Sequence, residues 1–178
     1  MTRTRTVIRP MRPADIDAVV QIEQQVHPRP WSAALFGTEL ALLDRRYRTA
    51  WEGEVLVGYG GVLLAVDEAH ITTVAVDPRA RRRGIGGRLV EALLEAAVDM
   101  GATAATLEVG SANHGAQRLY SAFGFVPAGV RPRYYEATGE DAIIMWAYDL
   151  AGPDIAARRH HLRGQRDVGP RQQSQVVG

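Results

Sequence analysis

The segment from Val74 to Leu89, VAVDPRARRRGIGGRL, constrains the fold of this chain more than any other. An apolar run typical of a buried strand leads into an arginine-rich loop. Two glycines at alternate positions, Gly84 and Gly86, then precede an apolar stripe at helical spacing. The first amides of a helix have no partners within it, and glycines allow an anion to approach them closely. The segment therefore predicts a strand, loop and helix unit that binds a polyphosphate.

Other phosphate-binding motifs fit this segment less well. A Walker loop requires Gly-x-x-x-x-Gly-Lys-Ser/Thr, but all 21 basic residues of the chain are Arg. A dinucleotide-binding Gly-x-Gly-x-x-Gly motif would need a third glycine where Leu89 stands. In that alternative, Glu108 near the end of the next strand would bind a ribose hydroxyl. A solvated run of charge beside an ordinary helix start is the third interpretation of the loop.

The rest of the chain predicts a mixed α/β domain. Hydrophobic periodicity, capping residues and turn residues predict the order β, α, α, β, β, β, α, β, α, β, β. The corresponding residues are 6–11, 13–27, 32–43, 47–51, 55–66, 70–76, 85–100, 104–109, 113–123, 125–132 and 141–150. A right-handed crossover through the helix at 85–100 makes the strands at 70–76 and 104–109 parallel neighbours.

Length and composition indicate one globular domain over residues 1–150, followed by a basic C-terminal tail over residues 151–178. The tail holds five Arg against two Asp and shows no apolar periodicity, so we expect it to be disordered. Contact between the tail and RNA is the alternative. The chain shows no long apolar run, no signal-peptide pattern and no metal-ligand spacing. We therefore expect a cytoplasmic protein without a metal.

Two motifs in register resemble those of the GCN5-related N-acetyltransferase (GNAT) family. The pattern Arg81-x-x-Gly84-x-Gly86, directly after the strand end Val-Ala-Val-Asp-Pro, resembles the family's acetyl-coenzyme A signature. The pattern Asn113-x-x-Ala116-x-x-Leu119-Tyr120-x-x-x-Gly124-Phe125 resembles its second motif. The resemblance spans residues 8–150. It implies a mixed, mostly antiparallel central sheet with a splayed parallel pair and with helices on both faces.

The resemblance also implies acetyl-coenzyme A as cosubstrate. Glu108, on the strand beside the cofactor strand, is the candidate general base, and Tyr120 is the candidate acid for the leaving thiolate. The backbone amide of Val76 is the candidate hydrogen-bond donor to the oxyanion. The residues expected to bind the cofactor are Val74, Ala75, Val76, Arg81, Arg82, Arg83, Gly84, Ile85, Gly86, Gly87 and Asn113.

Within the family, the chain is similar to the bacterial ribosomal-protein-alanine N-acetyltransferases. The resemblance rests on Pro30-Trp31-Ser32, on Leu107-Glu108-Val109 and on the final hairpin around Tyr134 and Tyr135. It implies that the acceptor is the N-terminal alanine of a small-subunit ribosomal protein. We expect Trp31, Tyr134 and Tyr135 to bind that peptide. One position departs from the pattern, because Gly110 stands where the family usually has Arg.

Four alternatives to this function remain open at the sequence level, because a fold does not fix a substrate. The acceptor could be a lysine side chain or a small-molecule amine. It could be a broader set of protein N-termini. The chain could also be a non-catalytic module that binds acetyl-coenzyme A or RNA.

Overall fold

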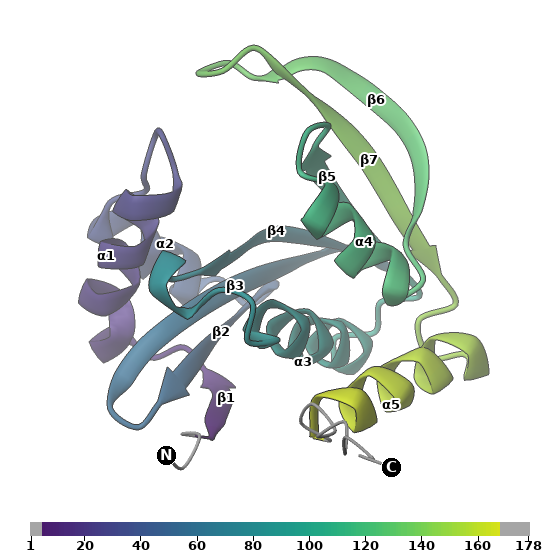
Figure 1. Ribbon diagram of the computed structural model, residues 1–178, viewed down its shortest axis with the longest axis horizontal. Helices are drawn as coiled ribbons and strands as arrows, with labels where there is room; N and C mark the ends of the chain where they lie inside the picture. The colour runs from purple at the N-terminus through teal and green to yellow at the C-terminus, as the bar shows by residue number, and fades with distance from the viewer. Residues whose placement is uncertain (1–4, 168–178) are drawn as a thin grey trace, which may run out of the picture.

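The computed structural model describes residues 5–167, which form one seven-stranded sheet with helices on both sides (Figure 1). The strands lie in the order β1-β2-β3-β4-β5-β7-β6. The strands are β1 (Thr6–Pro10), β2 (Arg45–Glu52), β3 (Val55–Ala65), β4 (Glu68–Val76), β5 (Ala104–Gly110), β6 (Val126–Tyr135) and β7 (Glu140–Tyr148). The helices are α1 (Ile16–Val26), α2 (Ala33–Ala41), α3 (Ile85–Asp99), α4 (His114–Ala122) and α5 (Pro153–Asp167).

The sheet is antiparallel except at β4 and β5, whose parallel pairing comes from the crossover through α3. This pairing covers only the partners Glu68 with Ala104, Ala69 with Ala105 and His70 with Thr106. Beyond them the strands separate, and Figure 1 shows β5, β6 and β7 bending away from the first four strands. The predicted fold class, including the splayed parallel pair, is confirmed.

Two helical layers bury the two faces of the sheet. Apolar side chains of α1 and α2, such as Val19 and Phe36, pack with Tyr47 and Tyr59 from the sheet. On the opposite face, α3 and α4 share a larger core that includes Leu93. Burial of these faces is the main force that holds the helices on the sheet, at about 25 cal/mol per Å² of apolar surface.

The predicted helix boundaries follow from local capping. The Ser32 hydroxyl accepts a hydrogen bond from the Leu35 amide at 3.2 Å and starts α2. Asn113 caps α4 in the same way, through the Ala116 amide at 3.1 Å. Gly101 follows α3 and Gly124 follows α4, and their φ values of 95° and 98° are typical of glycines that end a helix.

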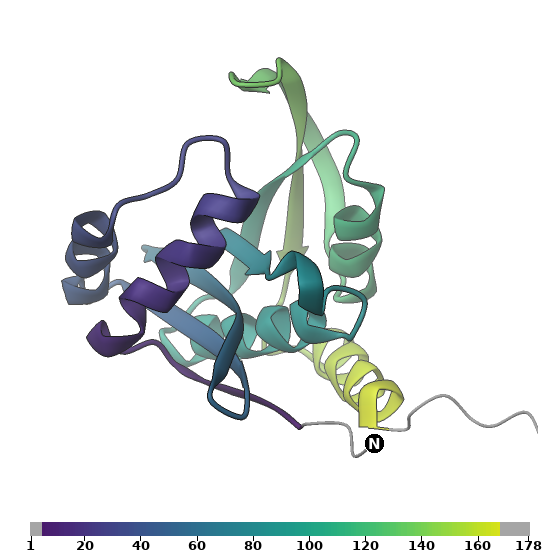
Figure 2. The same cartoon turned by 60° about the vertical axis from the view of Figure 1, so that its left-hand side comes forward.

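The expectation of a disordered tail is wrong for residues 153–167, which form α5 (Figure 2). Pro153 begins the helix, and Ile155, only 6% exposed, packs into the core shared by α3 and α4. Arg163 and other arginines of α5 pair with acidic residues of α3. Sequence periodicity missed α5 because its partners are charges on another helix. Residues 168–178 lie outside the described part of the chain.

Within residues 5–167, no helix combines the length and apolar character needed to cross a membrane.

Candidate functional site

The opening between β4 and β5 exposes the backbone of β4 along one edge. The Asp77 amide donates to the Val57 carbonyl of β3 at 2.9 Å. Because successive amides of a strand point to opposite sides, the Val76 amide points away from β3 and into the opening. An unpaired strand edge of this kind accepts an extended ligand through main-chain hydrogen bonds.

Thr73 adds a polar group on the same edge. A register shift near Gly61 places Thr73 at an irregular point of the pairing between β3 and β4. The Thr73 hydroxyl is buried and has no hydrogen-bond partner among the described residues. A buried hydroxyl without a partner costs free energy, so its presence beside the opening fits a ligand that supplies the missing hydrogen bond.

The glycine turn after β4 has the backbone geometry of an anion site. Arg82 and Gly84 both adopt left-handed conformations, with φ values of 65° and 78°, directly before the first residue of α3. Turns with alternating backbone handedness aim successive amides at one point, and here they adjoin the positive end of a helix dipole. The turn can therefore hold phosphate oxygens.

Two of the arginines in this loop are engaged elsewhere. Arg79 pairs with Asp77 at 2.8 Å, and this contact lowers the pKa of the Asp77 carboxyl. Arg83 pairs with Glu52 of β2 at 3.1 Å. Arg81 and Arg82 are exposed, and Arg81 is within 3.4 Å of the Val76 carbonyl. The loop can therefore bind phosphate mainly through its backbone amides. Its remaining arginine side chains can add further hydrogen bonds.

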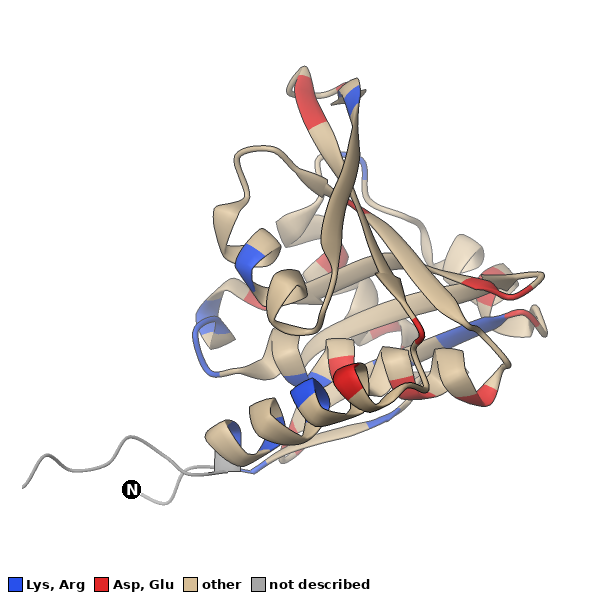
Figure 3. Cartoon of the chain, turned by 90° about the vertical axis from the view of Figure 1, so that its right-hand side faces the viewer, with Lys and Arg blue, Asp and Glu red and all other residues tan. Residues whose placement is uncertain are grey.

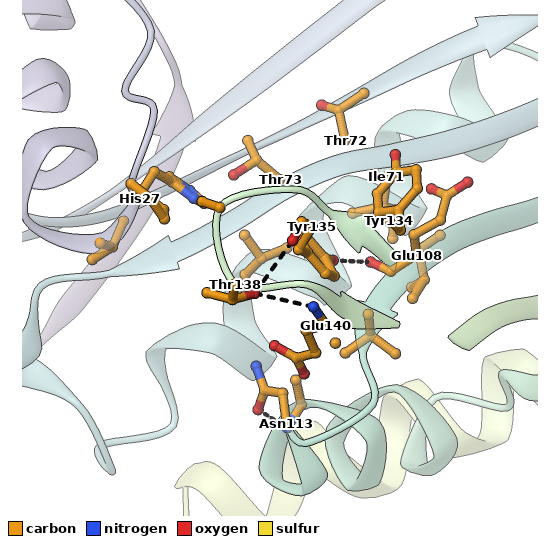
Figure 4. Close-up of a pocket in the computed structure, with 18 of the residues that line it drawn as sticks. His27, Ile71, Thr72, Thr73, Glu108, Asn113, Tyr134, Tyr135, Thr138 and Glu140 are labelled. Atoms are coloured by element: carbon orange, nitrogen blue, oxygen red, sulfur yellow. Dashed lines mark hydrogen bonds between the residues drawn. The ribbon is translucent and has the colours of Figure 1, made fainter. Parts of the chain in front are cut away.

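A pocket of about 890 Å³ occupies the opening and extends toward the β6–β7 hairpin (Figure 4). Its walls come from β4, β5, α4, the hairpin and the loop after α1. They include Thr73 and Val74 from β4, and Glu108 and Tyr120 from the far side. A pocket of this size holds a ligand arm and a peptide end together.

Glu108 is held in place by two neighbouring side chains, those of His70 and Arg131. Its carboxylate lies 2.6 Å from the His70 Nε2 atom and 3.3 Å from the Arg131 Nε atom. The Glu108 side chain is 11% exposed. A carboxylate with a histidine at hydrogen-bond distance can accept a proton and pass it on.

Tyr120 forms a different wall of the pocket, on α4. Its ring packs edge-on against Phe125 with the centroids 5.8 Å apart, and 8% of the residue is exposed. Burial raises the pKa of the Tyr120 phenol well above its usual value, with a smaller contribution from Tyr135. The phenol is therefore neutral, and a donor, at ordinary pH.

The final hairpin places two tyrosines over the pocket. Tyr134 and Tyr135 meet edge to face at 5.2 Å, and the Tyr135 hydroxyl is 3.5 Å from the Glu108 carbonyl. Burial raises the pKa of Tyr135 to about 12, with smaller contributions from Tyr134 and Glu108. Across the pocket, Arg29 of the loop after α1 pairs with Glu136 of the hairpin at 2.9 Å.

Of the three residues predicted to bind the peptide, Trp31 is the one that does not line the pocket. Its ring packs on Phe36 at 5.5 Å, in the core beneath α1 and α2. The neighbouring residues His27, Pro28 and Arg29 line the pocket instead. An aromatic residue next to a helix start can pack into the core equally well, and the Trp31 ring does so here.

Sequence reasoning also missed His70, which lines the pocket, and Glu23, which is a buried carboxylate of α1. His70 alternates with the buried residues Ala69 and Ile71 and so faces the open side of the sheet, a pattern that could have identified it. Glu23 is 5% exposed and accepts hydrogen bonds from the Trp31 amide, at 3.0 Å, and from the Tyr59 hydroxyl. A carboxylate on the apolar face of a helix was the signal that could have identified it.

Gly110, which departs from the family pattern, lies against Glu140 of β7. A Cβ atom at Gly110 would stand 2.5 Å from the Glu140 Oε1 atom, which accepts a hydrogen bond from the Ala112 amide at 2.8 Å. The carboxylate of Glu140 thus fills the space beside the strand end, where the family usually has an arginine.

The comparison with known proteins agrees with this geometry. Residues 16–125 match the model of the acetyltransferase (GNAT) family. The chain belongs to the GNAT family. Members of this family are acetyltransferases that use acetyl-coenzyme A. The chain is therefore an acetyltransferase.

Individual proteins are similar to this chain over most of its length. The N-alpha-acetyltransferase RimI of Mycobacterium tuberculosis is 38% identical over 138 residues, which cover 74% of this chain and 85% of that protein. The crystal structure of the ribosomal-protein-S18-alanine N-acetyltransferase from Escherichia coli matches with a TM-score of 0.74 and 31% identity. That match covers 82% of this chain and 94% of the other. The yncA protein of Salmonella typhimurium, solved with its cofactor acetyl-CoA, shares the fold at a TM-score of 0.72 and 20% identity.

Proposed function

We propose that this GNAT enzyme transfers the acetyl group of acetyl-coenzyme A to the N-terminal α-amino group of a protein in the cytoplasm. The similar ribosomal-protein-S18-alanine N-acetyltransferase from Escherichia coli suggests the N-terminal alanine of a ribosomal protein as the acceptor. One observation carries the proposal. A pocket at the open strand pair is flanked by a carboxylate, Glu108, and by a buried neutral phenol, Tyr120.

The residues present fit acetyl-coenzyme A. The unpaired edge of β4 from Val74 to Val76 can pair with the amide groups of its pantetheine arm, and the buried Thr73 hydroxyl offers a further hydrogen bond. The glycine turn at Gly84 can hold its diphosphate. When bound, the cosubstrate supplies an activated thioester carbonyl.

Glu108 acts as the general base in this proposal. An α-amino group has a pKa of about 7.7 to 8.0, so much of it carries a proton near pH 7 that must be removed before attack. The Glu108 carboxylate faces the pocket from β5, and His70 can pass the proton onward. General base catalysis of this kind contributes about 10² to 10⁴ in rate.

Tyr120 and Val76 act on the other side of the thioester. The Tyr120 phenol can donate a proton to the departing thiolate, because its raised pKa keeps it protonated. The Val76 amide, which points into the opening, can donate to the carbonyl oxygen as negative charge develops on it. The assignment of Tyr120 rests on its position in the pocket, and that of Val76 rests on the direction of its amide.

The acceptor peptide would enter between the loop after α1 and the β6–β7 hairpin. Tyr134 and Tyr135 give this entrance an aromatic surface with two hydroxyls, which suits an extended peptide end. His27 and Arg29 form the opposite rim, and the ion pair between Arg29 and Glu136 links the two sides. The acceptor amine would then reach Glu108 at the base of the pocket.

A peptide assay with the full chain and acetyl-coenzyme A tests the proposal. The substrates are a peptide that begins with alanine and contains one internal lysine, the same peptide with a blocked N-terminus, and a matched peptide that begins with methionine. Mass spectrometry then locates the added acetyl group. We expect modification of the free alanine peptide at residue one only. Acetylation of the blocked peptide at lysine would show a lysine acetyltransferase instead, and equal rates with alanine and methionine would show a broader enzyme.

A further inference from the structure

Helix α5 lies outside residues 16–125, which match the family model, and is held on α3 by charge. The Arg159 Nη2 atom lies 2.8 Å from the Glu95 Oε1 atom. Arg163 contacts two acidic residues of α3, with its Nε atom 2.7 Å from Glu91 and its Nη2 atom 2.9 Å from Glu95. Figure 3 shows α5 along the bottom of the molecule, where acidic and basic positions gather.

Arg166 completes this network at the end nearest the glycine turn. Its Nη2 atom pairs with the second oxygen of Glu91, and its side chain is only 16% exposed. The guanidinium carbon stands 5.9 Å from the ring centre of Phe123. These contacts fix an otherwise flexible side chain in one position.

The position of Arg166 is against the glycine turn itself. A Cβ atom at Gly87 would stand 2.7 Å from the Arg166 Nη1 atom, and one at Gly84 would stand 3.5 Å from its Cδ atom. The aliphatic part of Arg166 therefore covers Gly84, and the guanidinium lies beside the first turn of α3. The two glycines leave the space in which this arginine sits.

The charges of the network favour an anion at this point. Three guanidinium groups, of Arg159, Arg163 and Arg166, face two carboxylates, of Glu91 and Glu95. Within these ion pairs of the described residues, guanidinium groups exceed carboxylates by one, beside a helix N-terminus that is itself positive. A guanidinium has five N–H donors on more than one edge, so it can bind a carboxylate and a phosphate at once.

We propose that Arg166 binds a phosphate of the nucleotide end of coenzyme A, so that α5 forms one wall of the cofactor site. This inference rests on the proposed function, because it takes acetyl-coenzyme A as the ligand of the glycine turn. Glu91 orients Arg166 toward the turn, and Arg159 and Arg163 hold α5 on α3. The phosphate site of this chain thus has a side-chain contact from beyond residues 16–125.

Calorimetric titration of the full chain with coenzyme A tests this proposal, with Arg166→Gln as the variant. The matched control is Arg158→Gln, which changes an exposed arginine about 12 Å further along α5 that belongs to none of these ion pairs. We expect Arg166→Gln to weaken binding of coenzyme A about tenfold and Arg158→Gln to change it less than twofold. Equal affinity of wild type and Arg166→Gln overturns the proposal.

A second measurement separates phosphate binding from a structural role of Arg166. Turnover of S-acetylpantetheine, which lacks all the phosphates, is compared with turnover of acetyl-coenzyme A. Phosphate binding predicts that Arg166→Gln lowers kcat/KM for acetyl-coenzyme A alone. An equal loss with both donors shows a structural role and overturns the proposal. Arg166→Lys, which keeps the charge without the planar fork, should recover part of the loss.

Dephospho-coenzyme A identifies the phosphate concerned. If Arg166→Gln loses affinity for this analogue as well, the diphosphate is the partner; if the loss vanishes, the ribose phosphate is. Either result supports the proposal. Failure of the wild-type chain to bind coenzyme A would instead defeat the proposed function. Binding by wild type that is unchanged in Arg166→Gln would defeat only the present inference.

Discussion

The His70 Nε2 atom lies 2.6 Å from the Glu108 Oε2 atom, at the point where the parallel pairing of β4 and β5 ends. The two side chains face the open side of the sheet and line the same pocket. A histidine and a carboxylate at this distance share a proton, so they form a unit that can accept one from an acceptor amine.

Replacing Glu108 tests its role as the base. Glu108→Gln keeps the size of the side chain but removes the basic carboxylate, so we expect kcat for peptide acetylation to fall by about 10²-fold or more. Affinity for coenzyme A, measured by calorimetry, should stay within a factor of two. Glu136→Gln, a carboxylate on the exposed rim of the same pocket, is the matched control and should retain nearly full kcat. Full activity of Glu108→Gln would remove Glu108 from the mechanism.

His70 should matter through Glu108. A hydrogen bond to a charged group contributes about 1.5 to 3 kcal/mol, so His70→Ala is expected to lower kcat by on the order of tenfold. The double variant with Glu108→Gln should be little worse than Glu108→Gln alone, because both changes disable one unit. Steady-state kinetics of the four proteins gives the coupling. Additive losses would show that the two residues act independently.

The raised pKa of Tyr120 predicts how activity behaves on the alkaline side of the pH profile. Burial raises the pKa of the phenol above its usual value of about 10, so it stays protonated as the pH increases. We expect kcat/KM for a lysine-free peptide to rise until about pH 8, as the acceptor amine loses its proton, and then to stay level to about pH 10. Tyr120→Phe should lower kcat without changing this shape. A fall in wild-type activity well below pH 10 that Tyr120→Phe abolishes would contradict a raised pKa.

The stability of the loop after α1 should depend on Glu23. Glu23→Ala leaves the buried Tyr59 hydroxyl and the Trp31 amide without their acceptor, which costs about 1 to 3 kcal/mol for each buried group left unpaired. Urea unfolding should therefore show a loss of about 2 kcal/mol or more, and KM for the peptide should rise with KM for acetyl-coenzyme A unchanged. Glu54→Ala, on an exposed turn, is the control. A variant as stable as this control would contradict the buried network.

Gly84 should be needed for its backbone conformation. Its φ value of 78° is unfavourable for a residue with a Cβ atom, and the turn amides must remain open to phosphate. We expect Gly84→Val to abolish measurable binding of coenzyme A in calorimetry. Gly53→Val is the matched control, because Gly53 has a φ of 61° in a turn where a Cβ atom would meet nothing within 4 Å. Normal binding by Gly84→Val would show that the phosphate lies elsewhere.

Local signals carried much of the fold. Neighbouring residues predict the strand, glycine turn and helix around Gly84 and the caps at Ser32 and Asn113. The structure confirms these predictions. The parallel pair followed from the crossover through α3. The helix α5 could not be predicted in this way, because its arginines are satisfied by Glu91 and Glu95, which lie more than 60 positions earlier in the sequence.

The same distinction between local signals and partners distant in the sequence applies to the candidate site. Glu108 and Tyr120 could be placed because each stands at a fixed point of a motif that defines the strand and helix carrying it. The partners that set their chemistry, His70 and Arg131 around Glu108, come from separate strands that meet only in the folded sheet. Trp31 illustrates the opposite error, since its residue type suggested a peptide contact and its position serves the core.

The most direct test of the account is a crystal structure of the chain with a bisubstrate analogue, in which coenzyme A is joined to the N-terminus of an alanyl peptide. We expect the pantetheine arm to lie between β4 and β5 and to hydrogen-bond to the backbone near Val76. The sulfur should be within reach of the Tyr120 hydroxyl, and the alanine nitrogen should face Glu108. An analogue bound outside this opening, or with its nitrogen away from Glu108, would contradict the mechanism proposed for this chain.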